Sequence, residues 1–445
     1  INMTEGPILL KLMQFSVPLI LTSILQLLFN AVDIIIVGKY TGTTALAAVG
    51  STTALINVLI NLFIGISIGT NVLAARFFAA KMDKELHDTV HTSVAFAIIS
   101  GVVMGVIGIL LARFALTIMD TPDDVIDQSV LYMRIYFCGM PFFMTYNYCA
   151  AILRAIGDTR RPLIFLAISG AINAELNYIL VRFFHMGVAG VAIATVVSQF
   201  ISCLLVVICL IRNNGSVKLD FRQLSVKWRY LKEIFKVGVP AGLQSTVINM
   251  SNALLQSSVN SFGSNAMAGY TAANNILGFM YVSVNSITQS CMSFMSQNLG
   301  AGKKERLDKI FRNCLILDFI VPVFLGVIAF LFSNQLLSIY TDNPLDISAG
   351  VEILSITTIT YFLCGIMDLI PGAMRGLGHS TIPMFLSIIG TVGTRLVWIF
   401  GLFPTHHSLR FLFISYPVSW LITIAFQIVC YYFVRRKVMA NKLTK

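Results

Sequence analysis

Long apolar stretches separated by short polar segments make up most of this chain. A run of about 18 or more apolar residues is long enough to cross a bilayer as an α-helix. A membrane β-barrel would instead show segments of about ten residues that alternate between apolar and polar positions. The continuous runs therefore predict an all-α membrane protein with twelve spans. The predicted spans are residues 12–37, 45–78, 93–117, 127–154, 162–184, 187–212, 231–260, 268–299, 307–338, 350–375, 381–403 and 408–434.

The second half of the sequence repeats the first at a spacing of about 221 residues. Residues 154–159 align with residues 375–380, and Pro18 aligns with Pro240 after a shift of one more residue. Each half holds six predicted spans, and an even number returns the chain to its starting side of the membrane. The two six-helix bundles are therefore expected to share one orientation, related by a pseudo-two-fold axis along the membrane normal.

The same repeat sets the expected domain boundaries. Residues 1–212 form an N-terminal six-helix lobe, 213–236 a basic cytoplasmic linker, and 237–445 a C-terminal six-helix lobe. Parallel repeats of this kind are the plan of some secondary transporters, in which the substrate binds between the two repeats.

Composition supports a membrane protein, and the placement of charge predicts its orientation. Hydrophobic residues make up 57% of the 445 residues and charged residues 11%, too few to cover a soluble surface. The net charge is +11, but Lys and Arg gather on one side of the predicted membrane, as in the 212–236 loop and the tail from Arg435. We therefore expect a multi-pass cell-membrane protein with both termini cytoplasmic, whose first span acts as the insertion signal, and no nucleic-acid partner.

Motifs for nucleotide binding and hydrolysis are missing. Gly38-Lys39 is followed by Tyr40 and lacks the glycines of a phosphate-binding loop. The eight cysteines stand singly, mostly in apolar runs, so we expect free thiols rather than a metal site. The sequence therefore predicts a protein that is not an enzyme, has no cofactor, and takes its energy from an ion gradient.

Ionisable side chains inside a span are costly and are functional candidates by default. Two ion pairs would offset part of that cost: Glu175 with Arg134, and Asp368 with Arg395. A structural role is expected for the second pair. Asp33, the remaining candidate, lies near the outer end of the first span.

Polar residues of four spans are predicted at the depth of Asp33. Asn173 and Asn177 are four residues apart on the fifth span and therefore share one face. Hard oxygen ligands suit a small cation and a buried acid suits a proton. Asn and Thr that merely hydrogen-bond between helices are the alternative. The candidate cation-coupling residues are Asp33, Asn30, Asn173, Asn177, Thr195 and Tyr132, with Tyr136 one turn from Tyr132.

The seventh and eighth spans combine methionines with amides. Flexible Met surfaces adapt to varied ligands, although Met is also an ordinary core-filling residue. The substrate-cavity candidates are Met250, Asn252, Gln256, Asn274 and Met280.

Five separate motifs carry a family resemblance that extends over all twelve spans. They are Val17-Pro18 at the start of the first span, Asn30-x-x-Asp33 with Val37-Gly38, Ala45-Leu46-Ala47-Ala48-Val49-Gly50, Arg154-Ala155-Ile156-Gly157-Asp158 and Arg375-Gly376-Leu377-Gly378. With them the chain resembles the multidrug and toxic compound extrusion (MATE) family, in its prokaryotic branch with the coupling acid on the first helix.

The resemblance implies a secondary active multidrug efflux transporter, expected as a monomer. It would export organic cations and lipophilic compounds by H⁺ or Na⁺ antiport with alternating access. The cation role falls on Asp33, Asn173 and Thr195, with Tyr132 as a pocket tyrosine and Pro18 as the hinge of the first helix. Archaeal relatives have an acid at the position of Asn177, so the choice between Na⁺ and H⁺ stays open. With Na⁺, the ligands would come from Asp33, Asn173, Asn177 and Thr195.

Two other functions are compatible with this architecture. A lipid-linked saccharide flippase of the same superfamily would need a cationic cavity, and the seventh and eighth spans lack Lys and Arg beyond residue 236. A channel or membrane enzyme would need a pore repeat or a catalytic set, and neither is evident.

Overall fold

The structure is a computed structural model that describes residues 1–440, apart from the side chains of residues 43, 51 and 54. The described residues form helices and no strands, and nine of these helices are long and apolar enough to cross a membrane. The other three predicted spans are helical too. One is divided at Gly139, and two are rich in polar side chains.

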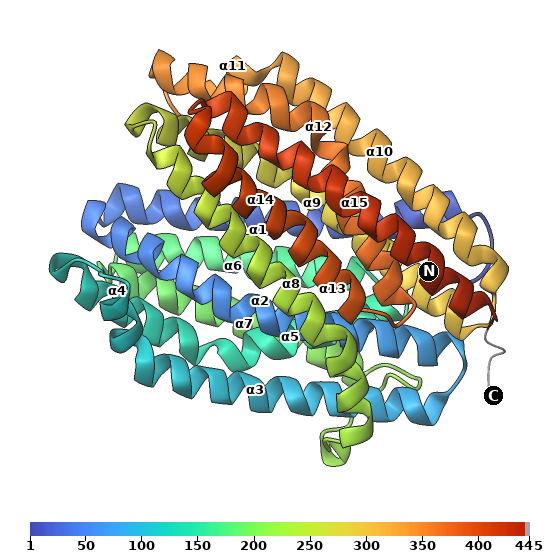
Figure 1. The fold of residues 1–445 in the computed structure, drawn as a ribbon. Coiled ribbons are helices and arrows are strands. Elements are labelled where there is room, and N and C mark those ends of the chain that lie inside the picture. The colour runs from blue at the N-terminus through green and yellow to red at the C-terminus, as the bar shows by residue number, and fades with distance from the viewer. Residues whose placement is uncertain (441–445) are drawn as a thin grey trace. The chain divides into compact units, whose positions relative to one another are not determined.

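The chain folds into two compact units (Figure 1). The first holds Ile1 and residues 21–238, and the second holds residues 2–20 and the chain from Val239 onward. In the first half of the chain the helices are α1 (Ile8–Tyr40), α2 (Thr43–Ala79), α3 (Asp83–Ile118), α4 (Asp123–Cys138), α5 (Met140–Ala155), α6 (Arg160–Arg182), α7 (Val188–Ile211) and the short η1 (Phe221–Gln223). In the second half they are α8 (Trp228–Asn260), α9 (Ser264–Gly300), η2 (Lys304–Arg306), α10 (Leu307–Leu331), α11 (Ser333–Ser338), α12 (Pro344–Gly376), α13 (Thr381–Ser387), α14 (Thr394–Val397) and α15 (Leu409–Ala440).

Helix α1 contributes to both units, and the change falls close to Pro18. Its first turns pack within the second unit, where the Ser16 and Ser290 hydroxyls are 2.7 Å apart. The rings of Phe15 and Phe294 meet edge to face there, with their centroids 5.7 Å apart. From Leu21 onward the helix belongs to the first unit. Proline within a helix removes one backbone hydrogen bond, which makes this position suited to bending.

Helix α8 divides in the same way, near Pro240. Its first turns lie in the first unit, where Phe235 packs edge to face on Phe96 at 5.2 Å between centroids. Its chain from Val239 belongs to the second unit. In both halves of the predicted repeat, the first helix is therefore divided between the two units.

The backbone repeats at the turns as well. Gly42 and Gly263, which are 221 residues apart, both have φ of 95° before a long helix. Gly157 and Gly378, also 221 apart, have φ of 90° and 89° and lie three residues after Arg154 and Arg375 in the two matching motifs. Such positive φ values favour glycine because side chains with a Cβ are strained there.

The predicted span 127–154 is two helices rather than one. Helix α4 ends at Cys138 and α5 begins at Met140, because Pro141 has no N–H to continue the hydrogen-bond ladder. Glycines of α3 lie against this junction: a Cβ at Gly101 would stand 2.6 Å from Pro141 Cα, and one at Gly105 would stand 2.8 Å from the Phe137 oxygen. Glycine at positions 101 and 105 therefore lets α3 pack closely against this junction.

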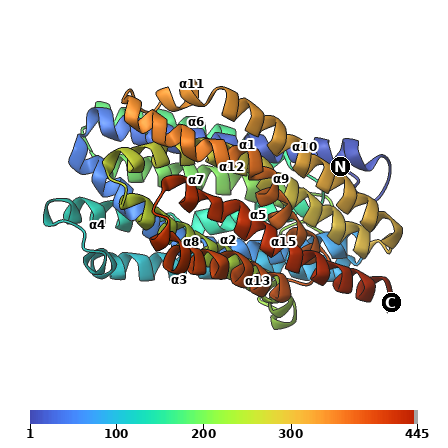
Figure 2. The same cartoon turned by 45° about the horizontal axis from the view of Figure 1, so that its top comes forward.

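Helix α12 is central to the second unit. It packs against α9, α10 and α15, which lie beside it in both views (Figures 1 and 2). Tyr361 of α12 meets Trp420 of α15 edge to face at 5.9 Å. The predicted span 381–403 is irregular, with π-helical turns at Ile388–Gly393 and Trp398–Leu402 between short α-helices.

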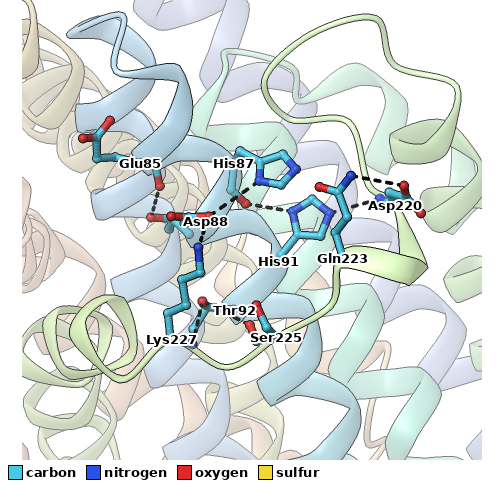
Figure 3. Close-up of polar contacts among 10 residues, drawn as sticks. Glu85, His87, Asp88, His91, Thr92, Asp220, Gln223, Ser225 and Lys227 are labelled. Carbon is cyan, nitrogen blue, oxygen red and sulfur yellow. Dashed lines mark hydrogen bonds and ion pairs between the residues drawn. The ribbon is translucent and has the colours of Figure 1, made fainter.

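The segment between α7 and α8 is fastened to the first turns of α3 (Figure 3). The Asp220 N–H donates to His91 Nε2 at 3.1 Å, so Nδ1 carries the proton that His91 donates to the His87 carbonyl at 2.8 Å. The Lys227 N–H donates to Thr92 Oγ1 at 3.2 Å, and Lys227 Nζ to Asp88 Oδ1 at 2.6 Å. The linker is therefore an ordered part of the first unit.

Removing the two acceptors of α3 should release this linker. The double variant His91→Leu with Thr92→Val leaves the N–H groups of Asp220 and Lys227 unpaired, at about 1 kcal/mol each. We expect trypsin to cleave after Lys218 or Arg222 about thirty times faster than in the wild type, because local opening sets that rate and about 2 kcal/mol in total corresponds to that factor.

Limited proteolysis of the purified protein in detergent measures this rate. The control is Ser100→Ala on the same helix, whose hydroxyl bonds its own helix at the Ala97 oxygen. Equal cleavage of the double variant and the control would show that these hydrogen bonds do not hold the linker.

Candidate cation site

A carboxylate on α1 lies between two amides of α6. Asn173 Nδ2 donates to Asp33 Oδ1 at 3.2 Å and to Oδ2 at 3.5 Å, and Asn177 Nδ2 donates to Oδ1. Asn173 and Asn177 are buried, and Asp33 is partly buried. The structure thus brings together three of the residues that the sequence placed at one depth.

Contacts on both sides of Asp33 align α1 with α6. One turn before Asp33, the ring of Phe29 lies directly over Gly170, where any Cβ would overlap it. Two turns after Asp33, Tyr40 meets Tyr178 edge to face at 5.9 Å between centroids. The contacts progress along both helices in the same direction, so α1 and α6 run parallel here. Gly170 matters because it lets the two backbones approach closely enough for the short Asn and Asp side chains to meet.

The two amide oxygens at this site are buried and have no hydrogen-bond partner in the described structure. They are Asn173 Oδ1 and Asn177 Oδ1. Buried polar atoms are nearly always paired, so these two acceptors call for a hydrogen-bond donor or a cation. Carboxylate and amide oxygens are typical ligands of small hard cations. A proton on Asp33 would also fit, because the protonated acid could donate to an amide oxygen.

The other predicted members of the site are placed differently. Thr195 Oγ1 donates to the Val191 carbonyl of its own helix at 3.0 Å. Asn30 is exposed and its side chain makes no hydrogen bond among the described residues. Tyr132 is buried, and its ring stacks on Tyr136 at 6.2 Å between centroids. The core of the site in this structure is therefore Asp33 with the two asparagines.

The predicted pair of Glu175 with Arg134 is wrong. Both side chains are exposed, and neither forms an ion pair among the described residues. Arg134 Nε instead donates to the Ile109 carbonyl of α3 at 3.2 Å. Similar depth on neighbouring helices favours such a pair, but depth alone does not bring two exposed side chains into contact.

The predicted pair of Asp368 with Arg395 is also wrong. Arg395 is 2% exposed, and its Nη1 donates to Asn252 Oδ1 at 2.6 Å. Its Nε donates to Ser419 Oγ at 3.3 Å, and its guanidinium lies over the Tyr416 ring at 4.4 Å. An amide, a hydroxyl and an aromatic face therefore take the place of the expected carboxylate.

The substrate-cavity candidates divide into three groups. Met250, which is 60% exposed, Gln256 and Asn274 lie at the surface of their helices. Asn252 holds Arg395, as described above. Met280 is 3% exposed and belongs to the core of the second unit.

Sequence reasoning missed one buried acid, Asp318 of α10. It is 0% exposed, and both of its carboxylate oxygens lack a hydrogen-bond partner in the described structure. It faces α12 at Gly365, where a Cβ would stand 2.9 Å from the carboxyl atoms. Asp368 follows one turn later on α12. The signal was available, because Asp318 stands inside the apolar run 315–322 and meets the criterion applied to the other acids.

Adding a methyl group at Gly170 should separate α1 from α6. Gly170→Ala would overlap the Phe29 ring, and overpacking of this kind costs about 1–3 kcal/mol. We expect a lower unfolding temperature in detergent, with the loss reduced in the double variant Gly170→Ala with Phe29→Ala. The control is Gly50→Ala, which has no atom within 4 Å of the added group. Equal unfolding temperatures for Gly170→Ala and Gly50→Ala would contradict the close approach.

Known proteins resemble this chain in sequence and in fold. The MatE family model matches the chain twice, over residues 18–179 and 240–400. The probable multidrug resistance protein YoeA of Bacillus subtilis is 30% identical over 439 residues, covering 96% of this chain and 94% of that protein. The two matches to the family model begin 222 residues apart, which confirms the internal repeat.

Solved structures agree on the fold. A Pyrococcus furiosus transporter of the MOP superfamily has a TM-score of 0.92 at 20% identity, covering 99% of this chain and 98% of that one. The Vibrio cholerae MATE transporter VcmN has a TM-score of 0.90 at 19% identity, covering 96% and 97%. The family match extends over more than half of the chain and the helices form two six-span bundles. This chain therefore belongs to the MatE family of membrane transporters.

Proposed function

We propose that this protein exports organic cations and lipophilic compounds by antiport with H⁺ or Na⁺, through alternating access. The observation that carries the proposal is the Asp33 carboxylate held by Asn173 and Asn177, each with a buried unpaired amide oxygen. The drug substrates are suggested by the relatives, since YoeA is named a probable multidrug resistance protein.

In the proposed cycle the coupling ion binds at Asp33 and neutralises the carboxylate. A Na⁺ ion would take ligands from Asp33, the oxygens of Asn173 and Asn177, and Thr195 after its hydroxyl turns from the Val191 carbonyl. Tyr132 would close the pocket from α4. Ion binding can shift a conformational equilibrium only by the difference between its affinities for the two states. Ion and drug would therefore favour opposite states, and the ion gradient would drive export.

Pro18 is proposed as the hinge of α1. The packing of α1 changes units at Leu21, close to Pro18, and Asp33 lies on the part that belongs to the first unit. A bend at Pro18 would move Asp33 relative to the first turns of the helix. The functional lobes would follow the sequence repeat, 1–212 and 237–445, joined by the linker 213–236.

The drug contacts would come from α8 and α9, through Met250, Gln256 and Asn274. Asn252 would act indirectly by fixing Arg395, and Met280 would contribute by repacking of the core. We further propose that the protein works as a monomer in the cell membrane with both termini in the cytoplasm, as the distribution of Lys and Arg favours.

A lipid-linked saccharide flippase is the second candidate. The relative from Pyrococcus furiosus is described as having a binding pocket of reverse polarity that suggests a different function. A flippase would need cationic side chains for its phosphates. Helix α8 from Val239 onward and the whole of α9 contain no Lys or Arg, which favours the drug exporter.

Neutralising the acid should uncouple transport. In liposomes with purified protein, Asp33→Asn should lose gradient-driven efflux of a fluorescent organic cation, because an amide can neither take up a proton nor neutralise a bound Na⁺ ion. The matched control is Glu175→Gln, an exposed acid on the other face of α6, which should keep wild-type efflux. Imposing Na⁺ and pH gradients separately identifies the ion. Full efflux by Asp33→Asn would refute the proposed role of the carboxylate.

Removing one amide should weaken Na⁺ binding while the acid remains. Asn177→Leu takes away an unpaired oxygen that would be a Na⁺ ligand, and also the N–H donor that stabilises the ion-free Asp33 carboxylate. Bonds to charged groups contribute about 1.5–3 kcal/mol, so the half-saturating Na⁺ concentration should rise about tenfold or more, whereas protons should bind more tightly because the charged carboxylate has lost a hydrogen bond. The control is Asn147→Leu, whose amide bonds only the Phe143 carbonyl of its own helix. An unchanged ion dependence in Asn177→Leu would remove this residue from the site.

A further inference from the structure

A cavity of about 480 Å³ opens at the ends of α6 and α7 where the chain enters the basic linker. It lies within the first unit and is far along α6 from Asn173 and Asn177. Its lining combines two guanidinium groups and two amides with an aromatic ring and a thiol. The lining residues are Arg161, Phe165, Cys209, Arg212, Asn213 and Asn214.

Most polar donors of this cavity are available for a ligand. Among the described residues, the side chains of Arg212, Asn213 and Asn214 form no hydrogen bond or ion pair. Arg212 and Asn214 are exposed and Asn213 is partly buried. An anion that enters the cavity would therefore not have to break existing contacts of these three side chains.

Arg161 is held in place by two contacts of its guanidinium, one of them with Cys209 of the cavity lining. Its Nε lies 3.2 Å from Asp158 Oδ2, and its Nη1 lies 3.5 Å from Cys209 Sγ. Among the residues that the structure describes, Asp158 is therefore the one acid in contact with the lining side chains, against two arginines. The N-terminus of α6, at Arg160, adds the positive end of a helix dipole beside the cavity.

Apolar side chains next to the cavity face outward. Ile164 is 53% exposed on α6, and Leu204 and Ile208 are 44% and 37% exposed on α7. These two helices are long and apolar enough to cross a membrane, so their exposed apolar residues face acyl chains. The cavity thus adjoins a lipid-facing surface at the end of the bundle where Lys and Arg gather.

We propose that this cavity binds the phosphate-bearing headgroup of an anionic phospholipid in the cytoplasmic leaflet. Arg161 and Arg212 would contact the phosphate oxygens in the planar geometry for which guanidinium groups are suited. Asn213 and Asn214 would bond the polar remainder of the headgroup. The acyl chains would follow Ile164, Leu204 and Ile208. Basic pockets between transmembrane helices on the cytoplasmic side bind anionic lipids in this way.

A soluble phosphate shares the headgroup chemistry but leaves the apolar surface unused. The adjoining hydrophobic side chains therefore favour a lipid over a free phosphate compound. The site is separate from the proposed drug and ion sites, so it does not depend on the transport function.

The first test uses the wild-type chain and its own cysteines. Purified protein in detergent is treated with N-ethylmaleimide, and the alkylation of Cys209 is followed by peptide mass spectrometry relative to exposed Cys138. Phosphatidylglycerol should slow alkylation of Cys209 relative to Cys138 about fivefold, as expected for a site that is about four-fifths occupied. Phosphatidylcholine and inorganic phosphate at equal concentrations should leave the ratio unchanged.

The second test counts bound phosphatidylglycerol by native mass spectrometry. The double variant Arg161→Gln with Arg212→Gln should bind at least about tenfold more weakly, because two charge-assisted contacts are lost. The control is Arg222→Gln, which removes an exposed arginine of the same linker outside the cavity and should bind as the wild type does. Loss in the double variant with retention in the control supports the site.

Three results would overturn the proposal. Equal protection of Cys209 by phosphatidylcholine would mean that charge is not recognised. Protection by inorganic phosphate as strong as by phosphatidylglycerol would assign the cavity to a soluble anion. Unchanged phosphatidylglycerol binding in a folded double variant would remove the two arginines from the site, and the wild-type alkylation test decides the matter if that variant does not fold.

Discussion

A carboxylate in an apolar helical bundle has to be satisfied by its neighbours, and the first unit is arranged around this requirement at Asp33. Moving a charge away from water is costly unless hydrogen bonds or an opposite charge replace the lost hydration. Asn173 and Asn177 supply N–H donors but leave their own oxygens unpaired. The polar atoms of the site are therefore only partly paired, and a cation or a proton could pair with the rest. A fully satisfied network would hold α1 and α6 together equally well but would have no reason to bind an ion.

The close approach of helices makes this arrangement possible. Asn and Asp have short side chains, so they meet only where backbones come near each other. Gly170 provides that approach for α1 and α6, and Gly101 and Gly105 do so for α3 against the α4–α5 junction. Proline has the complementary effect, since Pro18 and Pro240 stand where α1 and α8 change their packing partners. Small residues thus fix the contacts of this family fold, and prolines mark where contacts change.

The sequence predicted the fold well because its signals are one-dimensional. Span length, apolar runs and the 221-residue repeat can be read without knowing which side of a helix faces a neighbour. The pair Asn173 and Asn177 was also predictable, because residues four apart share a face and their depth matched that of Asp33. The two expected ion pairs were wrong because such contacts require three-dimensional information that the sequence pattern does not supply. Depth along the membrane normal places Glu175 near Arg134, but the contact depends on rotation about each helix axis, which depth does not determine.

Some polar residues satisfy themselves locally, and this too is hard to predict. The Thr195 hydroxyl donates to the carbonyl one turn earlier, a common alternative for Ser and Thr in membrane helices. Asp318 was missed although its signal was present. A single acid does not change the assignment of a long apolar run to a membrane span, so it is easily overlooked. Its unpaired carboxyl oxygens against Gly365 show that the second unit also contains buried polar chemistry.

The two halves share their backbone but differ in the polar side chains around Asp33. The cluster of Asp33 with the two asparagines is therefore particular to the first half. At the spacing of the repeat, Asp33 corresponds to Leu254 or Leu255, and Leu255 is fully buried in the core. Asn177 corresponds to Trp398, whose indole N–H donates to the Phe411 carbonyl at 3.0 Å. Because the turns at Gly42 and Gly263 keep the same φ, the backbone did not have to change for this divergence. An ion site at Asp33 would therefore require no special fold. It would require an acid and two amides at positions where the other half of the repeated scaffold has a leucine, Thr394 and Trp398.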